Sequence, residues 1–496
     1  MARTLMGGET EFAIALPRPG EEQPPEQRPL LEAIMAFARQ TLPLTSLAPN
    51  GRFLTNGGLL YLDCGLHLEW STPECATPHD VVRYLRAGDL IVSRLVAAYA
   101  AQAMPDADVF VSRCNIDYEA GTAWASHESY LARERNSEVL AANMVPFLVS
   151  RLVMCGAGGW EYQHPGLVFT LSPRTRFISR TTGADAQFSR SIFQTKDERL
   201  STAGTRRLHL SCSETLCSTL GTWLRFGTTA LVLAAIEAGE RPGDATALHS
   251  PLAAMLRFAA DPTCSERVPL IGGSGATAVD IQRQYLRCVE RHVGTPAMPD
   301  WAPDVVRVWR STLDDLEADS TRVNVVLDWA IKRAVFERFL VSRGFDGPGM
   351  RRWNTFLKRR RRLHPDSPEF RSALREAGFD DDQFAAFMQI RRQLLELDMR
   401  FGQIGPDGIF ESLDASGALR HDVPGVCHVE SAVTEPPQGT RAALRGAVIR
   451  RLSGLHTRYR ADWIGVTDLD ARATLDLGDP FQDREHWHPM PSHQSG

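Results

Sequence analysis

The sequence has no Cys-x-x-Cys pair and no long hydrophobic run. Its nine cysteines are an odd number, so they do not indicate a fully paired disulfide framework. The longest apolar stretch, residues 228–236, is far shorter than the roughly 20 residues that a helix needs to span a membrane. Residues 1–7 contain no apolar stretch of the kind found in a secretory signal. We therefore expect a protein of the reducing cytoplasm with no membrane partner.

An excess of positive charge is also missing. The 55 Lys and Arg residues face 60 Asp and Glu residues, and the net charge is −5. Partners of the nucleic-acid type are therefore not expected, nor is an anionic membrane surface. Hydrophobic residues make up 43% of the chain, which supplies a large core and excludes disorder over most of the chain. Because 496 residues exceed the usual single domain, we expect one large domain and a smaller one.

The pattern of apolar residues changes along the chain from strands to helices. Up to about residue 210, β-like runs at 59–62, 109–111 and 208–210 alternate with helical periodicity at 28–41 and 78–101. Beyond residue 220 the periodicity is helical, at 224–238, 278–293, 302–317 and 323–342. These patterns predict an α+β protein with a largely antiparallel sheet that carries the chemistry. The expected domains are a large catalytic domain, 1–424, and a small C-terminal domain, 425–496.

Residues 343–392 form a strongly charged helical insertion within the large domain. It contains the run Lys-Arg-Arg-Arg-Arg at 358–362, followed by an acidic stretch around Asp380. A charge run of this kind is typical of a solvated helical surface. The alternative interpretation is a docking site for an acidic partner, and the sequence leaves both open.

Two glutamates, Glu9 and Glu11, stand two residues apart in a strand-like segment at 8–12. In a strand, residues two apart point to the same face, so these two carboxylates would lie side by side and repel each other. A divalent cation relieves such repulsion, and a ligand set made only of oxygen favours Mg²⁺ over Zn²⁺. An exposed edge strand with two solvated acids is the alternative that this motif alone leaves open.

A second polar cluster follows. Tyr61, Asp63, His67 and Glu69 recur at even spacing, so one strand face, interrupted at Gly65, would carry a phenol, two carboxylates and an imidazole. Burying that many polar groups on one face without a ligand is costly. A surface strand explains any one of these residues, but it does not explain all four.

Basic residues precede another strand histidine. Arg206 and Arg207 lie shortly before His209. Arginine offers planar, bidentate donors that suit a polyphosphate, and a neutral histidine can serve as a metal ligand. Ion pairing of the two arginines in a surface turn is an equally good interpretation. His127 and Glu128 lack the second histidine of a zinc-protease helix, so that class of enzyme is disfavoured.

Together these motifs resemble those of the Pup ligase and depupylase family, relatives of glutamine synthetase and other carboxylate-amine ligases. The matching stretches include G-x-E-T-E-F at 7–12, N-G-x-x-L-Y-L-D-x-G-x-H-x-E at 56–69, P-F-L-x-x-R at 146–151, C-G-A-G at 155–158, R-R-L-H at 206–209, D-W-x-I-K at 328–332, P-P-x-x-T-R-A-x-L-R-G at 436–446 and D-P-F at 479–481. They follow the family's order over nearly the whole chain. The resemblance implies a curved antiparallel sheet that forms a cradle on helices, with the small C-terminal domain closing one end over a nucleotide.

The resemblance also implies roles for residues at matching positions. The expected Mg²⁺ ligands are Glu9, Tyr61 and Glu69, with Glu11 and His209 as further metal candidates; Asp63 is the expected catalytic base, and Thr72, Trp463 and Arg207 are the expected ATP contacts. The implied reaction uses ATP to convert a carboxylate to an acyl phosphate, which a lysine amine then attacks. The expected partners are a Pup-like protein modifier and lysine-bearing protein substrates.

Members of this family either join the C-terminal Glu of the small protein Pup to substrate lysines or, as depupylases, cleave that bond or deamidate the modifier. The resemblance favours the ligase branch, because the interval from Phe12 to Asn56 lacks the long extra segment of depupylases. Leu59 stands where the family usually has an Arg that contacts ATP. A depupylase-type amidohydrolase with Asp63 as nucleophile, and a degenerate protein that binds a modifier without turnover, are therefore the alternatives.

Overall fold

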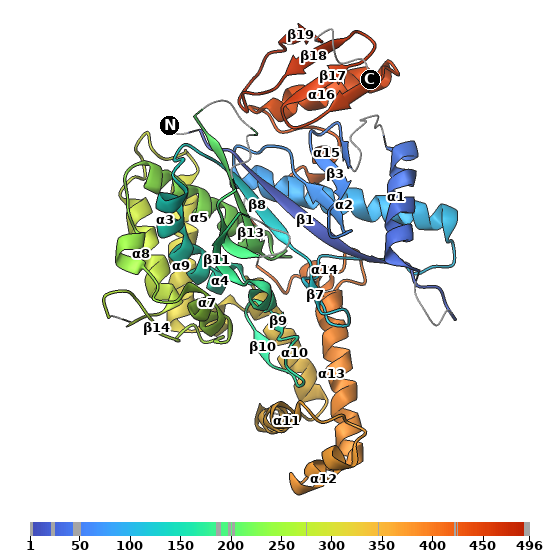
Figure 1. Cartoon of the computed structure of the whole chain (residues 1–496), viewed down its shortest axis with the longest axis vertical. Helices are drawn as coiled ribbons and strands as arrows, with labels where there is room; N and C mark the ends of the chain where they lie inside the picture. The colour runs from blue at the N-terminus through green and yellow to red at the C-terminus, as the bar shows by residue number, and fades with distance from the viewer. Residues whose placement is uncertain are drawn as a thin grey trace.

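A seven-stranded antiparallel sheet forms the centre of the molecule (Figure 1). The computed structural model of the chain describes residues 3–20, 25–42, 51–184, 190–196, 200, 204–273, 275–345, 347–420, 423 and 425–490. The strand order of the sheet is β13-β8-β1-β4-β3-β2, and β5 also pairs with β1. The strands are β1 (Met6–Ala15), β2 (Gly51–Phe53), β3 (Leu59–Leu62), β4 (Leu68–Ser71), β5 (Phe110–Ser112), β8 (Ser126–Ala132) and β13 (Arg206–Ser213).

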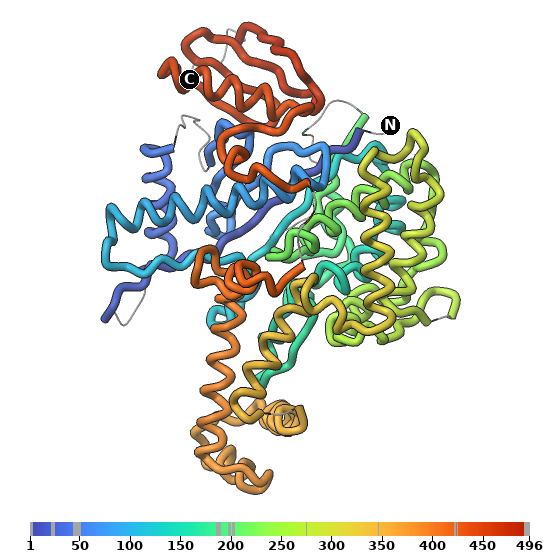
Figure 2. The backbone as a smooth tube through the Cα atoms, turned by 180° about the vertical axis from the view of Figure 1, so that it is seen from behind, coloured from blue at the N-terminus to red at the C-terminus, as the bar shows by residue number. Residues whose placement is uncertain are grey.

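One face of this sheet is covered by α1 (Gln27–Thr41) and α2 (Pro78–Ala103). Figure 2, from behind, shows α2 crossing the sheet on this side. Leu60 of β3 and Trp70 of β4 are paired in register and fully buried against these helices. Burial of Trp70 contributes on the order of 3 kcal/mol, and its indole N–H donates to the Tyr84 carbonyl of α2 at 2.9 Å. Because side chains alternate along a strand, the neighbours of Leu60 and Trp70 point to the opposite face.

A helical layer lies beside the sheet. It comprises α3 (Ser137–Ser150), α4 (Leu152–Cys155), α5 (Thr219–Glu237), α7 (Pro251–Ala259), α8 (Ala278–Glu290) and α9 (Ala302–Ala318). Within the described part of the chain, α5 is the one helix long and apolar enough to cross a membrane, and 89% of its apolar window is buried in the protein. Helices that are apolar on all sides are typical of the interior of a large domain, and α5 packs there against α2, α8 and α9.

The remaining short elements connect these layers. They are β6 (Ile116–Asp117), β7 (Thr122–Ala123), β9 (Gly159–Trp160), β10 (Phe169–Thr170), β11 (Arg180–Gly183), β12 (Ser191–Gln194), β14 (Val268–Pro269), β15 (Gly275–Ala276), α6 (Gly243–Thr246), α14 (Ile409–Ala415) and the 3₁₀ helices Pro173–Phe177 and Ser320–Val323. Apart from the parallel pair β11–β12, these short strands pair antiparallel.

A small C-terminal unit lies over one end of the sheet (Figure 1). It consists of α16 (Arg441–Gly454) and a four-stranded antiparallel sheet made of β16 (Tyr459–Ala461), β17 (Gly465–Asp468), β18 (Ala473–Asp476) and β19 (Trp487–Pro489). Its core also takes in Phe53 of β2. The preceding helix, α15 (Val429–Ala432), instead packs on α2. The separate small core therefore begins with α16, later than position 425, while Pro424 at the predicted boundary lies outside the described residues.

A helical appendage projects from the opposite end of the molecule (Figures 1 and 2). It is built from α10 (Asp328–Ser342), α11 (Gly347–Arg360), α12 (Pro368–Glu376) and α13 (Asp381–Phe401). Trp353 stacks between Phe379 and Phe387, with ring centroids 3.9 and 4.9 Å away. At the base, Lys332 Nζ and Asp398 Oδ1 form a buried ion pair of 2.6 Å. The predicted insertion 343–392 is thus part of a folded unit with its own core.

The structure confirms the predicted α+β class and its antiparallel sheet. It differs at residues 323–342, which the periodicity predicts as a single helix. A 3₁₀ turn ends at Val323, and α10 begins only at Asp328. The Asp328 carboxylate accepts backbone N–H groups of Cys217 at 2.6 Å and Ser218 at 3.0 Å, and so ties this point to the start of α5. Local periodicity carries no information about such a long-range contact.

The packing of α2 on the sheet can be tested at Gly88. A Cβ atom at Gly88 would lie 2.1 Å from Cδ1 of Trp70, so a side chain there forces the indole or the helix to move. We expect Gly88→Ala to lower the free energy of unfolding by about 1–3 kcal/mol, measured by urea unfolding. Gly454→Ala is the control, because nothing lies within 4 Å of its Cβ position. Equal stability of Gly88→Ala and the wild type would contradict the described contact.

Candidate active site

Three polar side chains from three strands form a row across the open face of the sheet. Glu11 of β1 pairs in register with Glu69 of β4, and Glu69 pairs with Tyr61 of β3. Directly opposite residues in antiparallel strands share a face and have Cβ atoms about 5 Å apart. The backbone register therefore holds two carboxylates and a phenol side by side, and we call this set the acidic row.

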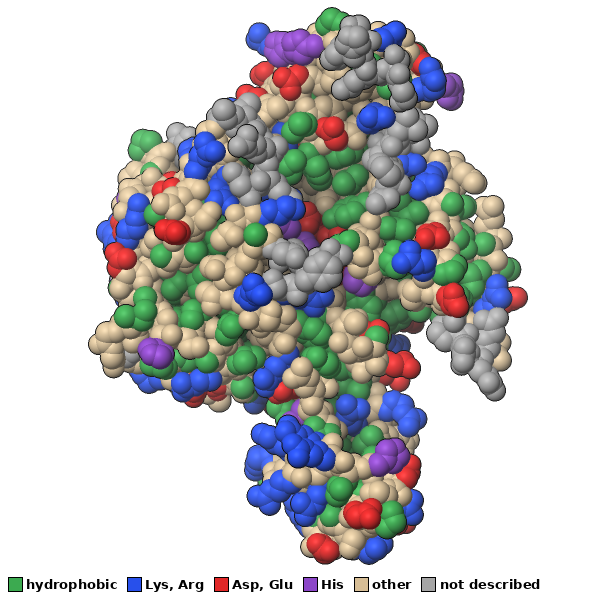
Figure 3. Space-filling view, viewed as in Figure 1, with side chains coloured by type: hydrophobic (Ala, Val, Ile, Leu, Met, Phe, Trp, Pro, Cys, Tyr) green, Lys and Arg blue, Asp and Glu red, His purple; other side chains and the backbone are tan. Residues whose placement is uncertain are grey.

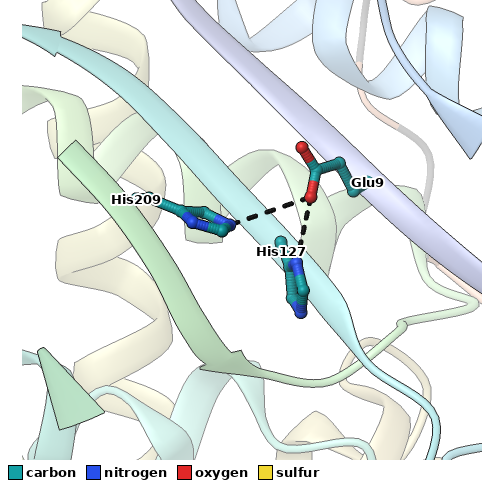
Figure 4. Close-up of side chains that lie close together, drawn as sticks. All are labelled: Glu9, His127 and His209. Atoms are coloured by element: carbon teal, nitrogen blue, oxygen red, sulfur yellow. Dashed lines mark hydrogen bonds and ion pairs between the residues drawn. The ribbon is translucent and has the colours of Figure 1, made fainter. Parts of the chain in front are cut away.

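Glu9 begins a second group on the same face. His127 Nδ1 of β8 lies 2.9 Å from Glu9 Oε2. His209 Nε2 of β13 lies 3.8 Å from the same oxygen, and Figure 4 shows both rings beside this carboxylate. Arg207, two residues before His209, donates from Nη2 to Glu9 Oε1 at 2.8 Å. Glu9 is thus surrounded by three basic side chains that two neighbouring strands supply.

The carboxylates of Glu9 and Glu69 have opposite electrostatic environments. Burial opposes ionisation of Glu9, but Arg207 and His127 outweigh it and hold the pKa of Glu9 well below its usual range. Burial raises the pKa of Glu69 well above its usual range, and the neighbouring charges of Glu9 and Glu11 raise it further. Oε1 of Glu69 is buried without a hydrogen-bond partner among the described residues. A bound cation would stabilise the ionised form of this buried acid.

Asp63 lies in the tight turn that joins β3 to β4. Its Oδ1 accepts the backbone N–H of His67 at 2.5 Å, and its Oδ2 lies 3.3 Å from His67 Nδ1. The turn places Leu66 in the left-handed region, with φ of 65°, which is a strained conformation for a branched side chain. Burial opposes ionisation of Asp63, but the hydrogen bonds from His67 lower its pKa. His67 Nδ1 also lies 3.3 Å from Glu11 Oε2, so the turn is tied to the acidic row.

A pocket opens beside this face, under the C-terminal unit. Its cavity volume is about 90 Å³. Thr72, Arg207 and Trp463, the three expected ATP contacts, all line it together with Glu9. Apolar side chains form most of the remaining wall, which suits a flat base. Figure 3 shows acidic and histidine side chains at the bottom of the hollow beneath the C-terminal unit.

Glu74 holds the C-terminal unit over this pocket. Arg441 Nε donates to Glu74 Oε1 at 2.6 Å, and Arg445 forms a second buried ion pair with the same carboxylate. Arg445 also donates to the Gly57 carbonyl at 2.9 Å, and its guanidinium carbon lies 4.9 Å from the ring centroid of Trp463. The contacts that fasten α16 to the sheet therefore also position Trp463 at the pocket.

The side chains on this face fit a divalent cation. Glu9 and Glu69 supply carboxylate oxygens, and Tyr61 supplies a neutral one, because burial and the nearby glutamates raise its pKa well above the usual value. Two sets of potential ligand atoms each lie within 4.8 Å of one another, namely Glu9, His127 and His209, and Glu11, Asp63 and His67. Glu9, Glu69 and Tyr61 offer only oxygen atoms, which suit a hard cation such as Mg²⁺, whereas the compact set around Glu9 adds two histidine nitrogens.

The structure brings the predicted site residues together, but on more strands than the sequence pattern suggests. Tyr61 and Glu69 lie on the two arms of a hairpin, and Asp63 and His67 lie in its turn. The prediction of one interrupted strand face was therefore wrong in detail. The side chains still share a face, because the hairpin pairs Tyr61 directly with Glu69.

His127 is the site residue to which sequence reasoning assigned no role. On β8 it alternates with Glu128, which is fully buried on the other face and pairs with Arg151 at 2.6 Å. That alternation was readable from the sequence and separated the two residues. The contact of His127 with Glu9 could not be predicted from the sequence, because the pairing of β8 with β1 is set by contacts between residues far apart in the chain.

Comparisons with known proteins identify the family. A model of the family described as Pup-ligase protein matches residues 4–352 and 382–467, and so leaves out residues 353–381 of the appendage. The Pup–protein ligase of Paenarthrobacter aurescens (strain TC1) is 32% identical over 496 residues, which cover 97% of both chains. The Pup–protein ligase of Rhodococcus erythropolis (strain PR4) is 30% identical over 493 residues, again 97% of both chains.

Two solved structures share the fold. The crystal structure of the complex between the prokaryotic ubiquitin-like protein Pup and its ligase PafA has a TM-score of 0.76 at 24% identity, covering 97% of this chain and 90% of that one. PafA in complex with ADP has a TM-score of 0.69 at 24% identity, covering 91% and 90%. The chain thus shares the fold of these structures, with an open antiparallel sheet. The chain belongs to the Pup ligase family. None of these comparisons supports the depupylase alternative.

The cation site can be tested at Glu69. Glu69→Gln replaces a buried carboxyl group whose ionisation is opposed by burial and by the charges of Glu9 and Glu11, so the metal-free variant should be at least as stable as the wild type. It should bind Mg²⁺ at least about 10-fold more weakly in calorimetry, because a ligand oxygen loses its charge. Glu119→Gln, at an exposed position, is the control. Unchanged Mg²⁺ affinity of Glu69→Gln would contradict the assignment.

The two buried ion pairs of Glu74 with Arg441 and Arg445 predict a specific pH dependence of stability. Burial opposes ionisation of Glu74, but Arg445 and Arg441 lower its pKa from 4.5 to about 2. A carboxyl group whose pKa falls on folding stabilises the folded state above its unfolded pKa, and loses that contribution as the pH falls towards the folded value. Glu74→Gln should therefore be less stable than the wild type in urea at pH 7, and the difference should shrink below pH 4.5.

A control distinguishes this effect from general acid sensitivity. Glu435 forms an exposed ion pair of 3.0 Å with Arg450, so Glu435→Gln should change stability little at any pH. If the stability difference between Glu74→Gln and the wild type stayed constant from pH 7 to pH 3, the stabilising role of the Glu74 ion pairs would be contradicted.

Proposed function

We propose that this protein is an ATP-dependent ligase that joins the C-terminal Glu of a Pup-like modifier to lysine side chains of target proteins. The observation that carries the proposal is that the pocket adjoins the acidic face, by which we mean the side of the sheet with Glu9 and the acidic row. Glu9 and its partner Arg207 both line the pocket. This arrangement places a polyphosphate next to carboxylates that can hold its cation. Membership of the Pup ligase family and the names of the relatives support the same reaction.

The reaction follows from the chemistry of a carboxylate. Its negative charge makes it a poor electrophile, so the γ-phosphoryl group of ATP is first transferred to it, which yields an acyl phosphate and ADP. A neutral lysine amine then attacks the acyl carbon, the isopeptide bond forms, phosphate leaves and the nitrogen loses a proton. Arg207 on the pocket wall is placed to offset phosphate charge. Mg²⁺ held by Glu9, Glu69 and Tyr61 would add to that charge neutralisation.

Asp63 is the proposed acceptor of the amine proton. Its lowered pKa keeps it ionised at neutral pH, as a proton acceptor must be. Its side chain is 15% exposed, so a group that arrives from solvent can reach it. Burial opposes protonation of His67, but Asp63 and Glu11 outweigh it and raise the pKa of His67. His67 therefore positions Asp63 and contributes positive charge next to it.

A modifier-binding protein without turnover is the second candidate, and Leu59 is the observation behind it. Leu59 packs against the core of the C-terminal unit, close to Phe53 and Trp463. The expected Arg at this position would bring positive charge, whereas Leu59 extends a hydrophobic contact. If the remaining cations at the pocket, Arg207 and Arg441, are insufficient for phosphate transfer, the protein binds its modifier without activating it.

The metal and the compartment complete the proposal. We assign Mg²⁺ to the acidic face on the oxygen-rich donor set described above. We also place the protein in the cytoplasm. Its nine cysteines are all free, and seven of them are buried, as expected of a protein that folds in a reducing compartment.

The proposed base is tested with Asp63→Asn. We expect conjugation of a modifier ending in Glu to a lysine-bearing acceptor to fall by roughly 10²–10⁴-fold, because the amide cannot take the proton. ATP affinity, measured by calorimetry, should stay unchanged, since Asp63 is not among the residues that line the pocket. Asp108→Asn, at an exposed position, is the control. Full conjugation by Asp63→Asn would exclude this role.

A preformed conjugate of modifier and target distinguishes a ligase from a hydrolase. In the depupylase alternative, the ionised Asp63 would attack the isopeptide carbonyl as a nucleophile. A preformed conjugate incubated with the wild-type protein and Mg·ATP should therefore remain intact if the proposal is correct. Release of modifier without ADP would establish the hydrolase instead.

A further inference from the structure

The appendage carries a run of five consecutive basic residues, Lys358 to Arg362, which we call the basic segment. The basic segment 358–362 covers the last turn of α11 and the residues just after it. Four of its five side chains are exposed, and only Arg360 is partly buried. Figure 3 shows Lys and Arg side chains gathered on the appendage, on the side to which the active-site hollow also opens.

The basic segment has no acidic partner among the described residues, unlike arginines elsewhere on the surface. Arg283 pairs with Asp314 at 2.8 Å and with Glu317 at 2.5 Å. A basic residue in the last turn of a helix is favoured by the helix dipole, but Arg361 and Arg362 lie beyond the end of α11. Neither ion pairing nor helix capping therefore accounts for the whole segment, and its charge is available to an outside anion.

A groove between α11 and α12 gives this charge a shape. Two hollows, of about 580 and 540 Å³, share Arg359, Arg360, Ala373 and Glu376, so they form one continuous surface. Ala373 lies in both hollows, and its short side chain leaves space between the helices. The edge-to-face contact between Phe356 of α11 and Phe370 of α12, with ring centroids 5.5 Å apart, fixes the two helices relative to each other. The groove is therefore preorganised, which reduces the entropy cost of binding.

The chemistry of the groove fits an acidic polypeptide better than a nucleic acid. Arginine donors match carboxylates in bidentate geometry, and the groove also contains Glu369 and Glu376 on the α12 side. Those two acids can accept N–H groups of a peptide. Single-stranded nucleic acids also require exposed rings for stacking, and Phe356 and Phe379 are each only 8% exposed.

We propose that the groove between α11 and α12 is a docking surface for an acidic segment of target proteins, which it recruits to the ligase site. The proposal rests on the proposed function for its biological role, but not for binding itself. Residues 353–381, which include most of α11 and all of α12, fall outside the match to the Pup ligase family model. A target held there lies on the side of the molecule where the site opens (Figure 3).

Binding is measured first, without ATP, so that the result does not depend on ligase activity. The probe is a fluorescein-labelled peptide of repeated Glu-Glu-Leu units, followed by fluorescence anisotropy. We expect binding that weakens several-fold as salt rises from about 50 to 300 mM, because exposed charges are screened. The variant Arg359→Gln/Arg361→Gln/Arg362→Gln should bind at least about 10-fold more weakly at low salt, with a flatter salt dependence.

The matched control removes the same charge elsewhere. Arg287→Gln/Arg307→Gln/Arg310→Gln changes three exposed side chains of the helical layer and should bind the peptide like the wild type. Because Arg361 and Arg362 lie outside any helix, their double substitution to Gln gives a second variant without risk to α11. Equal losses in the groove and control variants would overturn the proposal. Stronger competition by oligo-dT than by unlabelled peptide would overturn it in favour of nucleic acid.

Recruitment is measured with two acceptor proteins that differ only in a Glu-rich tail. The wild type should conjugate the tailed acceptor faster, and the groove variant should conjugate both at the rate of the untailed one. A groove variant that keeps the preference for the tail would contradict recruitment. If neither acceptor is conjugated by the wild type, the proposed function fails, while the binding measurement still decides the docking surface.

Discussion

Repulsion among carboxylates that the sheet register forces together is the interaction on which the site depends. Glu11 and Glu69 are opposite each other on neighbouring strands, and Glu9 lies two residues away on the same face. Two unit charges about 5 Å apart repel by roughly 3 kcal/mol at an effective dielectric constant near 20. Arg207 balances Glu9, but no described cationic side chain lies within ion-pair distance of Glu69. The metal-free sheet therefore disfavours the ionised form of Glu69, and a bound cation would stabilise that form.

Hydrophobic burial on the opposite face of the sheet offsets the free-energy cost of this repulsion. Leu60 and Trp70 alternate with Tyr61 and Glu69, so burial of the first pair against α1 and α2 fixes the direction of the second. A slip of one residue would exchange the two faces, which would bury carboxylates in the core and expose Trp70. The hydrophobic layer thus sets the position of the charges, and the C-terminal unit, held by Glu74, closes the end of the sheet where the pocket lined by Thr72 and Trp463 lies.

The sequence predicted the chemistry of the site better than its geometry. The spacing of Glu9 and Glu11 placed them on one face, and the motif resemblance named Asp63 and Thr72. The roles of His127 and Glu74 depend on contacts with residues more than one hundred positions away, which neither periodicity nor composition encodes. Most predicted helices end within a few residues of the observed ones, because their apolar stripes are local. The start of α10 at Asp328 was missed, because a contact with the loop before α5 sets it.

The central claim is that the acidic face holds a divalent cation next to the nucleotide pocket. Crystals of the protein grown with Mn²⁺ and ADP test it most directly, since the anomalous signal of manganese locates the ion independently of any model of the ligand. The account predicts an anomalous peak beside Oε1 of Glu69, together with ADP density between Thr72 and Trp463. ADP in the pocket with no manganese on the face formed by Glu9, Glu69 and Tyr61 would contradict it.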